Sequence, residues 1–229
     1  MLTAHTYLLL SEPHSAPLLI VDLGCGPGNS AVSLSAAFPG ATIIGLDVDE
    51  AMVGYAQEHH TVHVDGEGNE VPTGCNFFTQ DIAADWAEGW SEELKELLAG
   101  KVDAIFSNYT LHWVPSFDRL AANVSHLLRQ NGRSVFAGNL LYCGDIAAMS
   151  ETDEERALVE AVVRYPTEQQ YIADFLFAFR NAFFGRFIVN YEETFSFYPE
   201  GFYKNSKQQH ESFLLLSGYL THLTCYQVL

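Results

Sequence analysis

The feature of this sequence that most constrains its fold is a regular alternation of short apolar segments with segments of helical periodicity. Residues 18–23 form an apolar run interrupted only by Asp22, which is typical of a strand buried on both faces of a sheet. Residues 29–38 then show helical spacing, and a second apolar run follows at 42–47. The pattern continues with strands predicted at 77–80, 101–108 and 134–138 and helices at 49–58, 82–100 and 117–129. A repeated strand–helix–strand order predicts an α/β fold, with a doubly wound, mostly parallel sheet covered by helices on both faces.

The charge balance argues against two classes of partner. The chain has 229 residues, with 11 Lys and Arg against 29 Asp and Glu, and its net charge is -18. Such an acidic surface repels nucleic-acid phosphates and anionic lipid, so we expect neither nucleic-acid nor membrane partners. No apolar stretch is long enough to span a bilayer and no basic leader is present, which favours a cytoplasmic protein.

Patterns typical of metal sites are weak, and we expect no metal. The four cysteines lie far apart without metal-site spacing: Cys25, Cys75, Cys143 and Cys225. The polar, glycine-rich segment 59–74 is expected to be a surface loop or a small hairpin. It contains His59, His60 and His63 without a partnering Cys or carboxylate pattern, so a solvated surface explains them better than a metal site.

The segment VDLGCGPGN, residues 21–29, links the first predicted strand to the first predicted helix. Ligands of open parallel sheets bind beyond the carboxyl ends of the strands, and glycine there lets a ligand lie against the backbone. The spacing is G-x-G-x-G over Gly24, Gly26 and Gly28, whereas a dinucleotide site would have its third glycine at Asn29. Asp22 precedes the glycines and suits a ligand with a cationic head better than a pyrophosphate. An unrelated glycine turn is the alternative for this segment alone.

Further polar residues follow the other predicted strands. Asp47 ends the second strand, where a carboxylate can accept hydrogen bonds from both ribose hydroxyls of a nucleoside cofactor. Asp81 follows the third strand, and Ser107 and Asn108 end the fourth. Because the carboxyl ends of parallel strands meet at one edge of the sheet, we expect these residues to form one site with the glycine segment.

An acidic residue followed by G-x-G-x-G resembles the first motif of the class I S-adenosylmethionine-dependent methyltransferases. The resemblance extends over about residues 20–144 and implies a Rossmann-like fold with S-adenosylmethionine as the cofactor. It also implies that Asp81 takes the adenine amino group, that the Ile82 N–H meets the ring, and that the backbone near Asn108 meets the methionine moiety. The predicted cofactor-binding residues are Asp22, Gly24, Cys25, Gly26, Gly28, Asp47, Val48, Met52, Asp81, Ile82, Ser107 and Asn108.

The string SNYTLHWV, residues 107–114, resembles methyltransferases of small carboxylic acids. These are the juvenile hormone acid methyltransferases of arthropods and, more distantly, the trans-aconitate methyltransferases. The resemblance implies O-methylation of a small apolar acid, similar to juvenile hormone acid or farnesoic acid. His112 is the candidate catalytic residue, because it could donate a hydrogen bond to a carboxylate or act as a base for a hydroxyl or amine. A packing role is equally open for His112, and Tyr109, Trp113 and Tyr142 are further substrate-binding candidates.

No internal repeat or linker divides the chain, so we expect a single domain over residues 1–229. It would comprise a short N-terminal segment (1–17), the cofactor-binding core (18–144) and an aromatic-rich substrate-side part (145–229). In that last part we expect a helix at 151–163, helical spacing from Ile172 to Phe183, and a hairpin or one long strand within 187–198. The aromatic residues there are expected to be core. Compared with the resembled family both ends are expected to be shortened, with no clear strand in 218–229.

Two other functions remain open from the sequence. A protein that binds S-adenosylmethionine without catalysis would carry the same motifs. A nicotinamide-dependent oxidoreductase is disfavoured by Asn29 and Asp22.

Overall fold

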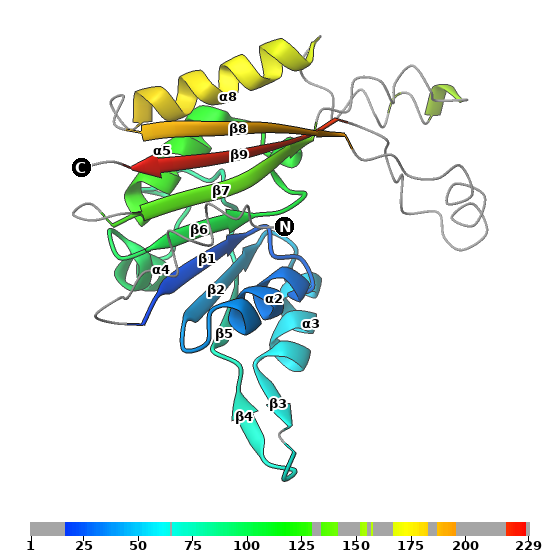
Figure 1. Cartoon of the computed structure of the whole chain (residues 1–229), viewed down its shortest axis with the longest axis vertical. Coiled ribbons are helices and arrows are strands. Elements are labelled where there is room, and N and C mark those ends of the chain that lie inside the picture. The colour runs from blue at the N-terminus through cyan, green and yellow to red at the C-terminus, as the bar shows by residue number, and fades with distance from the viewer. Residues whose placement is uncertain are drawn as a thin grey trace.

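The computed structural model describes residues 17–64, 66–129, 134–141, 152–154, 157, 167–182, 187–195 and 219–227. Its centre is a seven-stranded sheet in the order β5-β2-β1-β6-β7-β9-β8 (Figure 1). Its parallel strands are β1 (Leu19–Leu23), β2 (Thr42–Asp47), β5 (Cys75–Thr79), β6 (Ala104–Ser107) and β7 (Ser134–Leu141). The antiparallel strands β9 (Tyr219–Gln227) and β8 (Phe187–Phe195) extend the sheet beyond β7. The predicted mostly parallel sheet is confirmed, and each of these parallel strands overlaps its predicted range.

The alternation of side chains along β1 divides the core into two layers. Val21 and Leu23 belong to a cluster with the helices α4 (Glu92–Leu98), α5 (Phe117–Leu127) and α8 (Glu168–Ala182). Ile20 belongs to a cluster with α2 (Asn29–Ala37) and α3 (Glu50–His60). Figure 1 shows α2 and α3 together over the end of the sheet formed by β2 and β5. Because both faces are covered, β1 must be apolar at consecutive positions, which explains the apolar run in the sequence.

The aromatic residues of α8 are part of the core. Phe175 and Phe179 are fully buried, and their rings stack with centroids 4.3 Å apart. Phe175 also meets Phe117 of α5 edge to face at 5.2 Å, and Phe179 lies 5.0 Å from Phe136 of β7. The prediction that these aromatic residues are core is therefore confirmed for Tyr171, Phe175 and Phe179, whereas Phe177 of the same helix is 62% exposed.

The polar segment that was expected to be a loop or small hairpin is a hairpin. It consists of β3 (Val62–Val64) and β4 (Glu70–Pro72), which pair antiparallel and lie apart from the main sheet (Figure 1). Similarly, of the two alternatives for 187–198, one long strand is present as β8. No helix among the described residues has the length and apolar character to cross a bilayer.

The helix predicted at 82–100 is wrong over its first half, since only Glu92–Leu98 is helical. Residues 82–90 form turns, and two aspartates explain why. Oδ1 of Asp81 accepts a hydrogen bond from the Ala83 N–H at 2.8 Å. Oδ1 of Asp85 accepts from the N–H groups of Ala87 at 2.9 Å and Glu88 at 3.2 Å. Such local side-chain bonds compete with helical hydrogen bonding and stabilise turns instead.

The expectation that residues 218–229 lack a strand is also wrong. Tyr219–Gln227 forms β9, which lies between β7 and β8 and pairs with β8 along its whole length and with β7 from Leu220 onwards. The segment mixes Thr, Tyr, Leu and Cys rather than forming an apolar run, so its strand character depends on these two neighbours. The predicted helix at 151–163 lies largely outside the described residues, and so does the N-terminal segment 1–16.

Candidate functional site

The glycine segment forms a tight loop between β1 and α2. Gly24, Gly26 and Gly28 have φ angles of 69°, 52° and 93°, a region that disfavours residues with a Cβ atom. The N–H groups of Gly24 and Cys25 both donate to the carbonyl oxygen of Leu46, at 2.7 and 3.1 Å. These two bonds hold the loop against the carboxyl end of β2.

The three glycines have different neighbours. A Cβ atom at Gly24 would lie 2.1 Å from the Thr110 side chain, and one at Gly28 would lie 2.9 Å from His60. Glycine is therefore required at both positions by close packing. At Gly26 no described atom lies within 4 Å of the place a Cβ atom would occupy. Gly26 is thus the glycine whose open side can be approached by a ligand.

Asp22 is fully buried beneath this loop. Its Oδ2 accepts a hydrogen bond of 2.5 Å from the Ser30 hydroxyl, in the first turn of α2. Its Oδ1 has no hydrogen-bond partner in the described part of the chain. Burial raises the pKa of Asp22 to about 7, the Ser30 hydrogen bond opposes that shift, and the negative charge of Asp47 adds to it. A buried acid with an unsatisfied oxygen is favourably placed to meet a positive charge.

Asp47, at the end of β2, holds the loop from the side. Its Oδ2 accepts a hydrogen bond from the Gly26 N–H at 2.7 Å, and its Oδ1 accepts from the Asp49 N–H at 3.0 Å. Asp49 in turn caps α3, because its Oδ1 accepts from the N–H groups of Ala51 and Met52. This support of the loop is a role that the sequence did not indicate for Asp47.

Two predicted cofactor contacts beyond Asp47 are unusually exposed apolar residues. Val48 is 69% exposed and Met52 is 43% exposed. Both lie within five residues of Asp47, whose carboxylate accepts the hydrogen bond from the Gly26 N–H. Apolar side chains at the carboxyl ends of parallel strands can be covered by a flat, partly apolar ligand.

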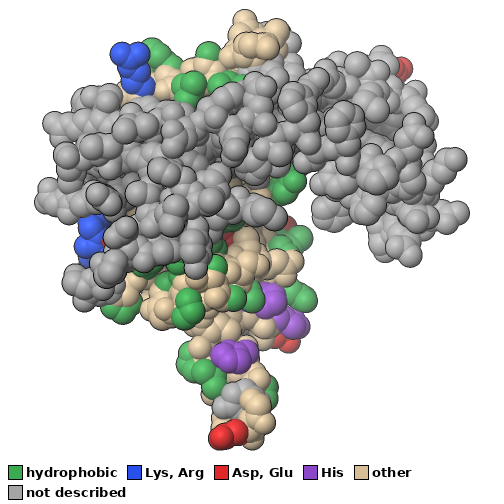
Figure 2. Space-filling model, viewed as in Figure 1, with side chains coloured by type: hydrophobic (Ala, Val, Ile, Leu, Met, Phe, Trp, Pro, Cys, Tyr) green, Lys and Arg blue, Asp and Glu red, His purple; other side chains and the backbone are tan. Residues whose placement is uncertain are grey.

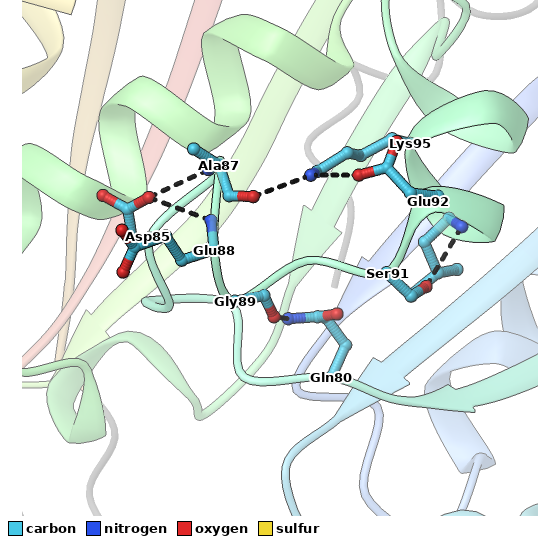
Figure 3. Close-up of polar contacts among 9 residues, drawn as sticks. Gln80, Asp85, Ala87, Glu88, Gly89, Ser91, Glu92 and Lys95 are labelled. Carbon is cyan, nitrogen blue, oxygen red and sulfur yellow. Dashed lines mark hydrogen bonds and ion pairs between the residues drawn. The ribbon is translucent and has the colours of Figure 1, made fainter.

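At the end of β5, buried amide groups hold the chain that contains Asp81 and Ile82. The Gln80 N–H donates to the Asp47 carbonyl at 2.7 Å, which joins this segment to the end of β2. Nε2 of the buried Gln80 donates to the carbonyls of Asp81 and Gly89, at 2.9 and 3.0 Å. Figure 3 shows the Gln80 side chain reaching Gly89, with Lys95 joining the Ala87 carbonyl to the Glu92 carboxylate beside it.

The end of β6 contacts the glycine loop directly. The buried Ser107 hydroxyl donates to the Leu23 carbonyl at 3.0 Å. The Thr110 hydroxyl lies 3.1 Å from the carbonyls of both Gly24 and Asn108. Tyr109, which lies between Asn108 and Thr110 in the chain, has a φ angle of 54°, the one positive value among the described non-glycine residues. A left-handed conformation costs a residue of this type about 1–2 kcal/mol, and such strain tends to concentrate at functional sites.

His112 and Trp113 follow in the short helix η1 (Leu111–Trp113). Burial lowers the pKa of His112 to about 4, so its imidazole is neutral at physiological pH. Its Nδ1 is buried and has no hydrogen-bond partner among the described residues. The Trp113 ring lies 5.1 Å from the His112 ring, and Trp113 is 60% exposed. Tyr142, the remaining predicted substrate residue, lies outside the described residues.

The structure thus joins the predicted site residues through direct hydrogen bonds between strand ends. Asp47 binds Gly26, Ser107 binds Leu23, and the segment of Asp81 is tied to Asp47. Four supporting residues were not predicted from the sequence: Ser30, Gln80, Thr110 and Asn123, whose amide donates to the carbonyls of Ile82 and Ala84. Of these, Asn123 could have been noticed in the sequence, because it is a polar residue on the apolar face of a predicted helix.

The three histidines near the hairpin lie at the end of α3 and in β3. His59 and His60 end α3 and His63 lies in β3, and Figure 2 shows histidine side chains on the surface of this region. Within the described ranges, no group of three or more His, Cys, Asp or Glu side chains could hold a metal ion.

Comparison with known proteins agrees with this geometry. Residues 21–134 match the family model described as "Methyltransferase domain". With its strand order and its acid–glycine loop, the chain belongs to the class I S-adenosylmethionine-dependent methyltransferases. Among curated proteins, trans-aconitate 2-methyltransferase of Acidovorax sp. (strain JS42) is 37% identical over 125 residues, which cover 55% of this chain and 40% of that protein. The match thus spans about 40% of the length of that relative.

Solved structures show the same fold over nearly the whole chain. A geranyl diphosphate methyltransferase in complex with GPP and sinefungin has a TM-score of 0.60 at 15% identity, covering 98% of this chain and 77% of its own. A putative S-adenosylmethionine dependent methyltransferase from Listeria monocytogenes has a TM-score of 0.56 at 16% identity, covering 98% of this chain and 97% of its own. At these identities the likeness establishes the fold.

Proposed function

We propose that this chain binds S-adenosylmethionine at the carboxyl ends of β1, β2, β5 and β6 and transfers its methyl group to a small carboxylic acid. The observation that carries the proposal is the buried carboxylate of Asp22 beneath a glycine loop whose middle glycine, Gly26, is open. Cationic sulfonium and ammonium groups suit such a carboxylate. The residues proposed to contact the cofactor are Asp22, Gly24, Cys25, Gly26, Gly28, Asp47, Val48, Met52, Asp81, Ile82, Ser107 and Asn108.

A nicotinamide cofactor fits this loop less well. In a dinucleotide site the second glycine lets the backbone approach the pyrophosphate, and the third lets the helix pack closely against the strand. Here α2 begins at Asn29 instead, and Asp22 places a second acid close to Asp47 beneath the loop. Two acidic groups disfavour a pyrophosphate, which carries negative charge itself.

A carboxylate acceptor fits the character of His112. Methyl transfer to a carboxylate forms a bond from an acceptor oxygen to the methyl carbon while the carbon–sulfur bond breaks and its electron pair stays on sulfur. The products are a methyl ester and S-adenosylhomocysteine, and no proton is removed. The protein must therefore align the oxygen with the methyl group and exclude water. A neutral His112 can donate one hydrogen bond to the acid without acting as a base.

Within the carboxylic acids we favour an apolar acid. The exposed Trp113 offers apolar contact area close to His112. The net charge of -18 repels a substrate with several carboxylates more strongly than one with a single carboxylate. The curated relatives are named trans-aconitate 2-methyltransferases, which supports carboxylate chemistry, while the apolar preference comes from this chain's own charge and aromatic residues.

Two measurements test the proposal. Calorimetric titration should show binding of S-adenosylhomocysteine and no binding of NAD. Transfer of a labelled methyl group from S-adenosylmethionine should then occur with a long-chain terpenoid acid and be slower with a short polyacid. Binding without transfer to any acid would favour a non-catalytic S-adenosylmethionine-binding protein, and binding of NAD alone would overturn the proposal.

A further inference from the structure

The segment after β5 is held in place by an amide side chain from a distant helix. Asn123 of α5 is 3% exposed and is the one polar residue among the buried residues of that helix. Its Nδ2 donates to the carbonyl oxygens of Ile82 and Ala84, both at 2.9 Å. A buried amide among apolar residues is unfavourable unless it is hydrogen-bonded, and here both of its N–H groups bond to this one segment.

Gln80 fixes the same segment from its other side. Nε2 of Gln80 donates to the carbonyl of Asp81 and, as Figure 3 shows, to that of Gly89. Together the two amides bind four carbonyl groups of the segment 80–89. The backbone of Asp81 and Ile82 is therefore oriented by buried donors, although this segment forms turns and not a regular helix or strand.

This orientation leaves one donor and one acceptor available on two consecutive residues. The Ile82 N–H makes no hydrogen bond to the described residues. The Asp81 carboxylate is exposed, and its bond to Ala83 uses Oδ1, so Oδ2 remains open to a ligand. An N–H beside a carboxylate oxygen matches a purine with an acceptor ring nitrogen next to an exocyclic amino group. A 6-oxo purine presents the opposite polarity, with a carbonyl oxygen facing the carboxylate and a ring N–H facing the backbone N–H.

We propose that Asn123 is a positioning residue that makes this site selective for a 6-amino purine over a 6-oxo purine. The inference rests on the proposed binding of S-adenosylmethionine. Asn123 acts through the carbonyls of Ile82 and Ala84, which set the direction of the Ile82 N–H relative to the Asp81 carboxylate. Without these two bonds the segment can rotate, and the donor and acceptor no longer face the purine edge together.

The experiment compares the dissociation constants of S-adenosylhomocysteine and of its 6-oxo analogue, S-inosylhomocysteine, by calorimetry. The wild type should prefer the adenosyl compound, and Asn123→Ala should reduce this preference by about tenfold or more, equivalent to about 1.4 kcal/mol. Asn123→Leu is the second variant, because it keeps the branching of the side chain at Cγ and suits the apolar face of α5, so it should fold well while losing the same preference.

Val124→Ala is the matched control. Val124 is a fully buried neighbour on α5, so its truncation should lower stability without changing the ratio of the two dissociation constants. A preserved ratio in folded Asn123→Leu, or an equal loss in Val124→Ala, would overturn the positioning role. Failure of the wild type to bind S-adenosylhomocysteine would instead overturn the proposed function, and with it this inference.

Discussion

The Gly26 N–H donates a hydrogen bond of 2.7 Å to the Asp47 carboxylate, so the acid that ends β2 also fixes the loop that follows β1. One carboxylate therefore joins two neighbouring strand ends. A ligand bound at Asp47 would meet a loop that is already held in position, which reduces the entropy that binding must overcome.

Asp47→Ala should weaken binding of S-adenosylhomocysteine by roughly 1.5–3 kcal/mol, the usual worth of hydrogen bonds to a charged group. The change removes a ribose acceptor and also releases the Gly26 and Asp49 N–H groups. Asp47→Asn is the matched variant, and its single acceptor oxygen should give an intermediate loss. Unchanged affinity in folded Asp47→Ala, measured by calorimetry, would remove Asp47 from the site.

Gly26→Val should abolish cofactor binding while the circular dichroism spectrum stays native-like. A branched side chain there would occupy the open side of the loop and would also be strained at a φ angle of 52°. Gly40→Val controls for the strain, because Gly40 has a φ angle of 85°, also has no described atom within 4 Å of a Cβ, and precedes the opposite end of β2. Equal binding by the two variants would mean that the loop does not face the cofactor.

Asp22→Asn should stabilise the free protein more at pH 8 than at pH 5. The folded state keeps the Asp22 proton up to a pKa of about 7, whereas the unfolded state releases it near 3.8. The folded state thus binds more protons between these values, so this contribution is fully present below pH 4 and is lost as the pH rises through 7. The asparagine removes the cost of a buried charge, which is on the order of a few kcal/mol at pH 8.

Thermal unfolding at the two pH values measures this difference, with Glu96→Gln on the exposed face of α4 as a control for loss of charge. An equal shift of the melting temperature at both pH values would contradict a protonated Asp22. The same Asp22→Asn variant should bind the cationic cofactor more weakly, so stability and binding are expected to change in opposite directions.

His112→Asn should reduce the rate of methyl transfer to a carboxylic acid by less than about tenfold, because Asn keeps a hydrogen-bond donor. If His112 were a general base for a hydroxyl or amine, the same change should cost roughly 10²- to 10⁴-fold. With a pKa of about 4, His112 should also produce no inflection in the pH–rate profile between pH 6 and 8. A large loss at every pH above the pKa of the substrate would exclude the carboxylate proposal.

The parts of the fold that the sequence revealed are those determined locally. The strands β1 and β2 are buried on both faces, so each can be recognised in the sequence as a short, mainly apolar segment. The glycine loop is equally visible, because its φ angles require glycine at fixed spacing. In contrast, β9 is a strand through its pairing with β7 and β8, and no feature of its own composition fixes those partners.

In the candidate site, too, the features set by local sequence could be predicted and those set by long-range contacts could not. The motif located Asp22 and Asp47, but their partners Ser30 and Gly26 depend on how the loop folds back on α2 and β2. The bonds from Asn123 to Ile82 and Ala84 cross 41 and 39 residues of sequence, so spacing alone could not predict them. Local patterns therefore place a site at the strand ends, and long-range contacts decide how its groups are oriented.

The position of β9 between β7 and β8 has a consequence for the order of events during synthesis. Ser134 and Phe187 both align with Gln227, so two segments far apart in the sequence are bridged by a third that leaves the ribosome later. Until 219–227 emerges, β7 presents an unpaired edge, and such edges are prone to pair with the wrong strand or another chain. Pairings this distant raise the contact order and slow folding. The nascent protein should therefore depend most on chaperones in the interval when β8 is available and β9 is not.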